Sequence, residues 1–166
     1  MALLVNFTLN GIPVCKAVEP EMSLLTVLRD VFGLTSPKCG CNRGDCGACT
    51  VIMDGKAVKS CIVLAATVEG KRIVTLDGLA SGDNLHPVQK AFYELGAVQC
   101  GYCTPGMVMA AAAFLLENPA PNESEVKEAL SGNLCRCGGY QKYVEAVLAA
   151  SRGEFGPLPK GCDFHV

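Results

Sequence analysis

The chain has 166 residues, half of them apolar, which suits one domain of average size or two small ones. Its net charge is −2, and its longest basic run is the pair Lys71-Arg72. This net charge and the scattered basic residues argue against nucleic-acid binding, which normally needs a concentrated basic face. The longest apolar run, 107–116, is too short to span a bilayer. We therefore expect no nucleic-acid partner and no membrane partner.

The N-terminal sequence has neither the charged region nor the cleavage site of a secretory signal peptide, so we expect a cytoplasmic protein. Thiols in the cytosol are normally kept reduced. The chain has 11 cysteines, an odd number. These observations disfavour a disulfide scaffold and favour metal binding.

The first half of the chain has the pattern of a small mixed sheet. Apolar and polar residues alternate as in half-buried strands, and Asn10-Gly11 and Asp54-Gly55 are strong signals for two-residue hairpin turns. Ser23 can cap a helix that ends at Gly33. The expected elements are strands over 5–9, 14–18, 50–53, 57–61 and 72–76 and a helix over 24–32. Together they predict an α+β domain over residues 1–80.

The second half of the chain has the pattern of helices. Pro87 suits a first helical turn, and Asn122 with Glu125 forms a cap-like pair. The expected helices span 87–95, 105–117, 123–130 and 140–150. Four helices of this length predict a small bundle over residues 81–150, followed by an extended tail over 151–166.

A first group of cysteines has the spacing C-x4-C-x2-C, formed by Cys41, Cys46 and Cys49, with Cys61 further along the chain. The first three match the spacing of a plant-type [2Fe–2S] cluster. Four thiolates must converge on a two-iron core, so we expect one curled loop to supply three and a neighbouring strand to supply Cys61. Four cysteines also suit tetrahedral zinc. Zinc sites usually use paired C-x2-C knuckles, so the spacing favours iron and sulfur.

A second group consists of two close pairs, Cys100 with Cys103 and Cys135 with Cys137. Each pair comes just before an expected helix, where free N–H groups and the helix dipole favour thiolates. Two facing helix starts would supply four sulfurs to a second core. Zinc stays open for this group taken alone. A thioredoxin-like redox pair would need a βαβ pattern, which the sequence does not predict.

Three cysteines remain outside these groups. Cys15 lies mid-strand and is expected to be a small core residue. Cys39 is not assigned as a ligand, because a ligand two residues before Cys41 would disturb the loop that carries Cys41, Cys46 and Cys49. Cys162 has no expected partner. His86 is expected to cap or pack at a helix start. The sequence has no Gly-rich phosphate loop, H-E-x-x-H motif or nucleophile elbow, so we expect no substrate-transforming site on this chain.

Three segments, 40–51, 99–106 and 132–137, resemble the iron–sulfur small subunit of the xanthine oxidase family of molybdenum hydroxylases, which includes carbon monoxide, aldehyde and N-heterocycle oxidoreductases. The resemblance covers residues 3–150. It implies a plant-ferredoxin-like (β-grasp) domain followed by a four-helix bundle. It also implies that the ligands are Cys41, Cys46, Cys49 and Cys61 for an outer [2Fe–2S] cluster and Cys100, Cys103, Cys135 and Cys137 for an inner one.

The resemblance further implies partners and a path for electrons. Electrons would leave a molybdopterin centre on a large subunit, pass the inner and then the outer cluster, and reach FAD on a medium subunit or an external acceptor. Gln99 and Cys137 would lie near the molybdopterin. The chain departs from the family at Gly138-Gly139-Tyr140, where Thr-Gly-Tyr is common, and so loses a hydroxyl cap at its last helix.

Two alternative functions stay open. A free-standing two-cluster electron carrier is disfavoured, because a single-cluster ferredoxin needs no helical second half. An interaction module held together by zinc would be colourless, whereas [2Fe–2S] proteins are red-brown.

Overall fold

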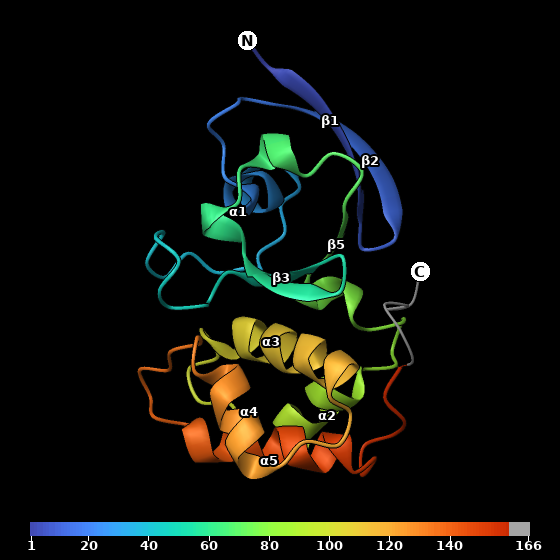
Figure 1. Ribbon diagram of the computed structural model, residues 1–166, viewed down its shortest axis with the longest axis vertical. Helices are drawn as coiled ribbons and strands as arrows, with labels where there is room; N and C mark the ends of the chain where they lie inside the picture. The colour runs from blue at the N-terminus through green and yellow to red at the C-terminus, as the bar shows by residue number, and fades with distance from the viewer. Residues whose placement is uncertain (160–166) are drawn as a thin grey trace.

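The computed structural model describes residues 1–159 and has a sheet in its first half and a group of helices in its second. Figure 1 shows the two halves stacked along the long axis, with α3 directly beneath the sheet. The strands are β1 (Leu3–Leu9), β2 (Ile12–Val18), β3 (Thr50–Met53), β4 (Lys56–Lys59) and β5 (Arg72–Val74). They form one sheet in the order β2-β1-β5-β3-β4, in which β1 and β5 are parallel and the other pairs antiparallel. The expected α+β class is confirmed.

Both predicted hairpin turns are present. Asn10 and Gly11 have φ values of 48° and 81°, and Asp54 and Gly55 have 49° and 84°. Two successive residues with positive φ form the turn whose twist matches the flanking strands, and Asn-Gly and Asp-Gly adopt it most readily.

The helix expected over 24–32 begins where predicted but is not a regular α-helix. Ser23 accepts a hydrogen bond from the Thr26 amide at 3.1 Å and so caps α1 (Leu24–Thr26). The chain continues as a π-helical turn (Val27–Val31) and then reaches Gly33, where φ is +68°. Helices commonly end at a residue in this left-handed conformation, which is usually glycine. Leu24, Val27 and Leu28 of this segment are fully buried in the core that the segment shares with the sheet.

The helical half matches the predicted elements to within one residue at each end. The helices are α2 (Pro87–Glu94), α3 (Thr104–Glu117), α4 (Glu123–Leu130) and α5 (Tyr140–Ser151). The buried side chain of His86 caps α2 by accepting from the Val88 amide at 3.2 Å, as expected. Asn122 and Glu125 form a reciprocal capping box at the start of α4.

The helix α3 is the central element of the molecule. It is rich in Ala and Met and is buried around almost its whole circumference, as expected of a helix enclosed on every side. It contacts β3 and β4 on one side and α2, α4 and α5 on the other. The helical core includes Ile52 and Val74 of the sheet and Leu79 from the turn that follows it. A second core lies between the sheet and the α1 segment and includes Val5 and Phe7. Within residues 1–159, no helix is long and apolar enough to cross a membrane.

Two expectations about cysteines were wrong. Cys61 does not lie on a strand, because β4 ends at Lys59 and Cys61 sits in the following 3₁₀ turn. The Ser60 hydroxyl donates to the Cys49 carbonyl at 2.8 Å, which helps to hold this turn. Cys15 is exposed rather than buried.

The strand register explains the exposure of Cys15. Cys15 pairs with Asn6 and so shares the solvent face of the sheet with it, opposite the face that buries Val5 and Phe7. Cys162 lies outside the described residues.

Candidate metal centres

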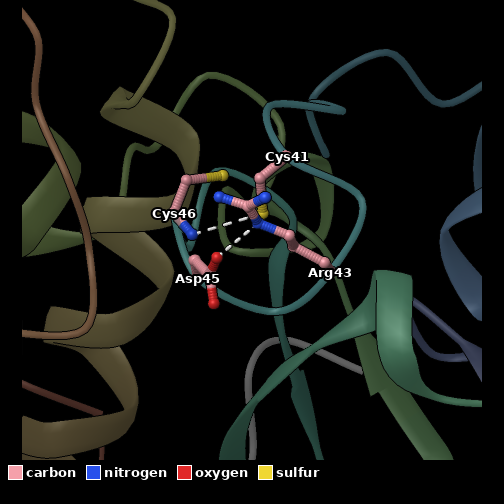
Figure 2. A network of polar contacts seen from close by, with 4 residues as sticks. All are labelled: Cys41, Arg43, Asp45 and Cys46. Atoms are coloured by element: carbon pink, nitrogen blue, oxygen red, sulfur yellow. Dashed lines mark hydrogen bonds and ion pairs between the residues drawn. The ribbon is translucent and has the colours of Figure 1, made fainter.

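The first cysteine set lies on a tightly curled loop between the α1 segment and β3. Asn42, Gly44 and Gly47 have φ values of 55°, 87° and 71°, which fold the chain back on itself. As a result, the Cys46 amide donates to the Cys41 sulfur at 3.4 Å (Figure 2). A loop of this shape turns backbone N–H groups toward sulfur, which stabilises thiolates.

The four thiols of this set lie close together. Cys41 is in side-chain contact with Cys46, and Cys49 with Cys61. Cys41 and Cys49 also interact electrostatically with both Cys46 and Cys61. The close packing of this set also explains why residue 40 is a glycine, because a Cβ there would lie 2.6 Å from the Cys46 sulfur. The structure therefore brings together all four cysteines predicted for the outer site.

The electrostatics of the set differ from one edge to the other. The backbone N–H groups of Cys46 and then Arg43 lower the pKa of Cys41, which is solvent-accessible, to about 6. Burial raises the pKa of Cys61 to about 11. Figure 2 shows the Arg43 guanidinium turned toward Asp45. The two side chains form an ion pair in which Nε lies 2.5 Å from Oδ2. Both side chains are exposed, so this ion pair adds little stability.

The second cysteine set joins two loops of the helical half. Cys103 is the N-cap residue of α3, and Cys135 and Cys137 precede α5. Cys103 is in side-chain contact with Cys135, and Cys100 with Cys137. Cys135 interacts electrostatically with the other three thiols. The structure therefore brings together the four cysteines predicted for the inner site.

This second set has a buried edge and an open edge. Cys103 and Cys135 are buried, whereas Cys100, Cys137 and the neighbouring Gln99 are exposed. The exposed thiols of the open edge are accessible to a partner. The surroundings of the buried thiols consist of residues of this chain.

Two tyrosines of α5 contact the buried edge, and sequence reasoning missed both. The Tyr143 hydroxyl lies 3.0 Å from the Cys135 sulfur and 3.4 Å from the Cys103 sulfur. The Tyr140 hydroxyl accepts from the Cys135 amide at 2.8 Å. Burial acts to raise the pKa of Cys135, but hydrogen bonds from Tyr143 and the Gly139 amide outweigh it and lower the pKa to about 7. Burial raises the pKa of Tyr143 itself.

The loops of the two sets contact each other directly. The Leu134 amide donates to the Cys46 carbonyl at 2.9 Å. The buried Asn133 side chain donates to the Gly47 carbonyl at 3.0 Å. The Tyr102 hydroxyl donates to the Cys39 carbonyl at 2.7 Å, which gives Cys39 a backbone role beside the first set while its side chain is exposed.

The chemistry of the donors fits two iron–sulfur clusters. No group of three or more His, Cys, Asp or Glu side chains within residues 1–159 is arranged to hold a metal ion as it stands. Each set instead offers four thiols as two contacting pairs. Four thiolates are the ligand set of a [2Fe–2S] cluster, whose two irons take two sulfurs each.

Comparison with known proteins defines the class. Residues 7–79 match the model of a 2Fe-2S iron-sulfur cluster binding domain, and residues 75–148 match that of a [2Fe-2S] binding domain. The chain is thus an iron–sulfur protein with two [2Fe–2S]-binding domains.

Relatives over nearly the whole length identify the family. The chain is 49% identical over 146 residues to the small FeS subunit of nicotinate dehydrogenase from Eubacterium barkeri, covering 88% of this chain and 93% of that protein. It is 48% identical over 149 residues to the iron-sulfur-binding subunit of xanthine dehydrogenase from Escherichia coli O157:H7, covering 87% of this chain and 91% of that protein. The chain belongs to the [2Fe–2S] small subunits of the xanthine oxidase family, and is an iron–sulfur subunit of the oxidoreductase type.

Solved structures agree with this assignment. Quinoline 2-oxidoreductase from Pseudomonas putida 86 superposes with a TM-score of 0.86 at 45% identity, covering 92% of this chain and 98% of that chain. The aldehyde oxidoreductase of Desulfovibrio desulfuricans ATCC 27774 gives 0.87 at 44% identity, covering 91% of this chain but 17% of that one. In that relative, the matching region is part of a longer polypeptide.

Proposed function

We propose that this chain is the electron-transfer subunit of a multi-subunit molybdenum hydroxylase. Its two clusters carry electrons from a molybdopterin centre on a large subunit toward FAD or an external acceptor. The observation that supports this most directly is the contact between the two cysteine loops. Cys135 is covalently joined to Leu134, whose amide is hydrogen bonded to the Cys46 carbonyl at 2.9 Å. This short route supports electron passage between the sites.

The proposal assigns eight ligands and three segments. The outer cluster is assigned to Cys41, Cys46, Cys49 and Cys61, and the inner cluster to Cys100, Cys103, Cys135 and Cys137. We assign residues 1–80 to a β-grasp domain, 81–150 to a four-helix bundle and 151–166 to a tail. Contact within each set of thiols supports the ligand assignment, and the matched family models support one cluster in each half.

The open edge of the inner site is proposed to face the large subunit. Gln99, Cys100 and Cys137 are exposed there, and Gln99 and Cys137 are proposed as neighbours of the molybdopterin. The adjacent side chains of Tyr102 and Leu134 are 48% and 54% exposed. Exposed apolar side chains around a functional group are typical of a docking surface.

A medium FAD-binding subunit is proposed to lie nearer the outer site. The exposed loop around Cys41 supports this, because it leaves Cys41 and Cys46 partly exposed at the surface. The names of the relatives as small FeS and iron-sulfur-binding subunits support a multi-subunit assembly. The cytoplasmic location stays a prediction.

The test is metal analysis of the chain purified gently from its host with all bound subunits retained. About four irons per chain, together with molybdenum and a large subunit, would support the proposal. Iron without molybdenum or a large partner would instead indicate a free-standing carrier. Zinc in place of iron would overturn the assignment of both clusters.

A matched pair of variants tests the docking face. Leu134→Asp places a charge on the proposed surface and should weaken retention of the large subunit in a pull-down. Ile12→Asp, at a side chain that is 66% exposed on the sheet hairpin, should leave retention unchanged. Equal retention in both variants would place the large subunit elsewhere.

A further inference from the structure

Tyr143 is a buried side chain that the electron-transfer role does not by itself require. It lies in the first turn of α5 and its side chain is 2% exposed. Its hydroxyl reaches sulfurs from two separate loops, 3.0 Å to Cys135 and 3.4 Å to Cys103. A purely apolar packing role would be served equally well by Phe, so the position of the hydroxyl needs an explanation.

The surrounding rings fix the direction of this hydroxyl. Phe92 on α2 stacks on the Tyr143 ring at 5.6 Å between centroids, with 5° between the planes. Tyr140 packs its edge against the same ring at 6.2 Å and 80°. Contacts of this kind hold an aromatic ring in one orientation. The hydroxyl is therefore held against the two sulfurs and does not swing freely.

Gly139 makes room for the hydroxyl. A Cβ at Gly139 would lie 2.7 Å from the Tyr143 oxygen and 2.8 Å from its Cζ. The φ of Gly139 is −73°, which any residue can adopt. Glycine is therefore required here for space and not for backbone conformation.

The direction of the hydrogen bond follows from the chemistry of cluster ligands. In the free thiol form, either the sulfur or the hydroxyl could donate. A cysteine that binds iron is a thiolate and has no proton to donate. In the loaded protein, the Tyr143 hydroxyl must therefore be the donor.

We propose that Tyr143 donates a hydrogen bond to the thiolate sulfurs on the buried edge of the inner cluster, chiefly Cys135, and thereby raises the reduction potential of that cluster. The inference rests on the proposed assignment of these cysteines as ligands. When the cluster gains one electron, negative charge on its sulfurs increases, and a fixed donor stabilises the reduced form more than the oxidised form. The proton stays on the tyrosine oxygen, and no bond is broken.

The test compares the intact complex with its Tyr143→Phe variant, which removes only the oxygen. A redox titration followed by electron paramagnetic resonance (EPR) reports both clusters separately. We expect the ratio of reduced to oxidised inner cluster at a fixed potential to fall about tenfold, which equals about 59 mV for a one-electron couple. The outer cluster should keep its potential. Tyr93→Phe, at an exposed tyrosine of α2, is the matched control and should shift neither cluster.

A second variant and a second measurement distinguish an effect of Tyr143 on the reduction potential from a purely structural role. Gly139→Ala should push the phenol away and lower the same potential, with the tyrosine still present. Pulsed EPR of the reduced complex in D2O should detect a deuteron close to the inner cluster that is missing in Tyr143→Phe.

Three outcomes would contradict either the inference about Tyr143 or the proposed function. An unchanged inner potential in Tyr143→Phe with full iron content would overturn the inference alone. Loss of inner-cluster iron in that variant would assign Tyr143 a structural role and would also overturn it. Absence of a second [2Fe–2S] signal in the unmodified complex would instead overturn the proposed function.

Discussion

The backbone amide of Leu134 donates to the backbone carbonyl of Cys46 at 2.9 Å. This bond joins the loop of the sheet half to the loop of the helical half at the point where each presents a thiol. The neighbouring residue Asn133 adds a bond from its side chain to the Gly47 carbonyl. The two cysteine loops are therefore joined into one structural unit by hydrogen bonds from Leu134 and Asn133.

The Asn133→Ala variant tests this unit. The Asn133 side chain is 5% exposed and donates to Gly47, so its removal takes a donor from a buried carbonyl. Because that carbonyl keeps its bonds from the Thr50 amide and hydroxyl, we expect a loss of about 0.5–1.5 kcal/mol of unfolding free energy, the net contribution of one hydrogen bond, measured by denaturant titration of the loaded protein. Glu94→Ala, at an exposed position on α2, should change it by about 0.5 kcal/mol or less. Equal effects of the two substitutions would contradict a special role for this contact.

Replacement of Cys103 by Ser should remove the inner cluster. Oxygen is a harder ligand than thiolate and matches this iron site poorly, and Cys103 lies at the buried edge of the set. Iron should fall from about four to about two atoms per chain, with loss of one of two EPR signals. Cys39→Ser, at an exposed cysteine, should keep both. If Cys39→Ser lost the outer signal instead, the assigned ligand set would be wrong.

Replacement of Cys61 by Ser should have the complementary effect. Cys61 is buried against Cys49 and Leu25 in one small cluster, so its thiol is directed into the first set. The outer EPR signal should disappear and the inner one remain. Cys15→Ser is the control, because Cys15 is exposed on β2. Retention of both signals in Cys61→Ser would show that another residue completes the outer site.

The features that could be predicted from sequence are local ones. Asn10-Gly11 fixes a hairpin through its own backbone preferences, and Ser23 and Asn122 begin helices through bonds to residues within three positions. The spacing of the first cysteine set predicted that its thiols lie close together for the same reason, since three of them share one loop. In each case, the chemistry lies within a few residues of the chain.

The features that were missed depend on contacts between distant segments. The exposure of Cys15 depends on which face of β2 the pairing with Asn6 selects. The contact of Tyr143 with Cys103 depends on how α5 packs beside the start of α3. No spacing rule encodes such packing, so the tyrosine could be recognised only as an apolar position of a helix.

The last prediction concerns the close approach of α3 to the first cysteine loop. A Cβ on Gly106 would collide with the carbonyl oxygen of Gly47 and lie 3.1 Å from the Cα of Ala48. Both obstacles are backbone atoms that cannot rotate away. Gly106→Ala should therefore lower the unfolding free energy by about 1–3 kcal/mol, even though Ala is the better helix former.

Gly132→Ala provides the matched control for this prediction. The nearest atom to a Cβ at Gly132 is the Nζ of Lys59 at 3.3 Å, the end of a flexible side chain that can move aside. Thermal unfolding of the loaded protein should show a clearly lower midpoint for Gly106→Ala than for Gly132→Ala. Because Cys103 is the N-cap residue of α3 and Gly106 touches the loop of Cys46, Gly106→Ala should also broaden the EPR signals of both clusters. Unchanged signals with an unchanged midpoint would mean that the helix and the loop can separate without cost.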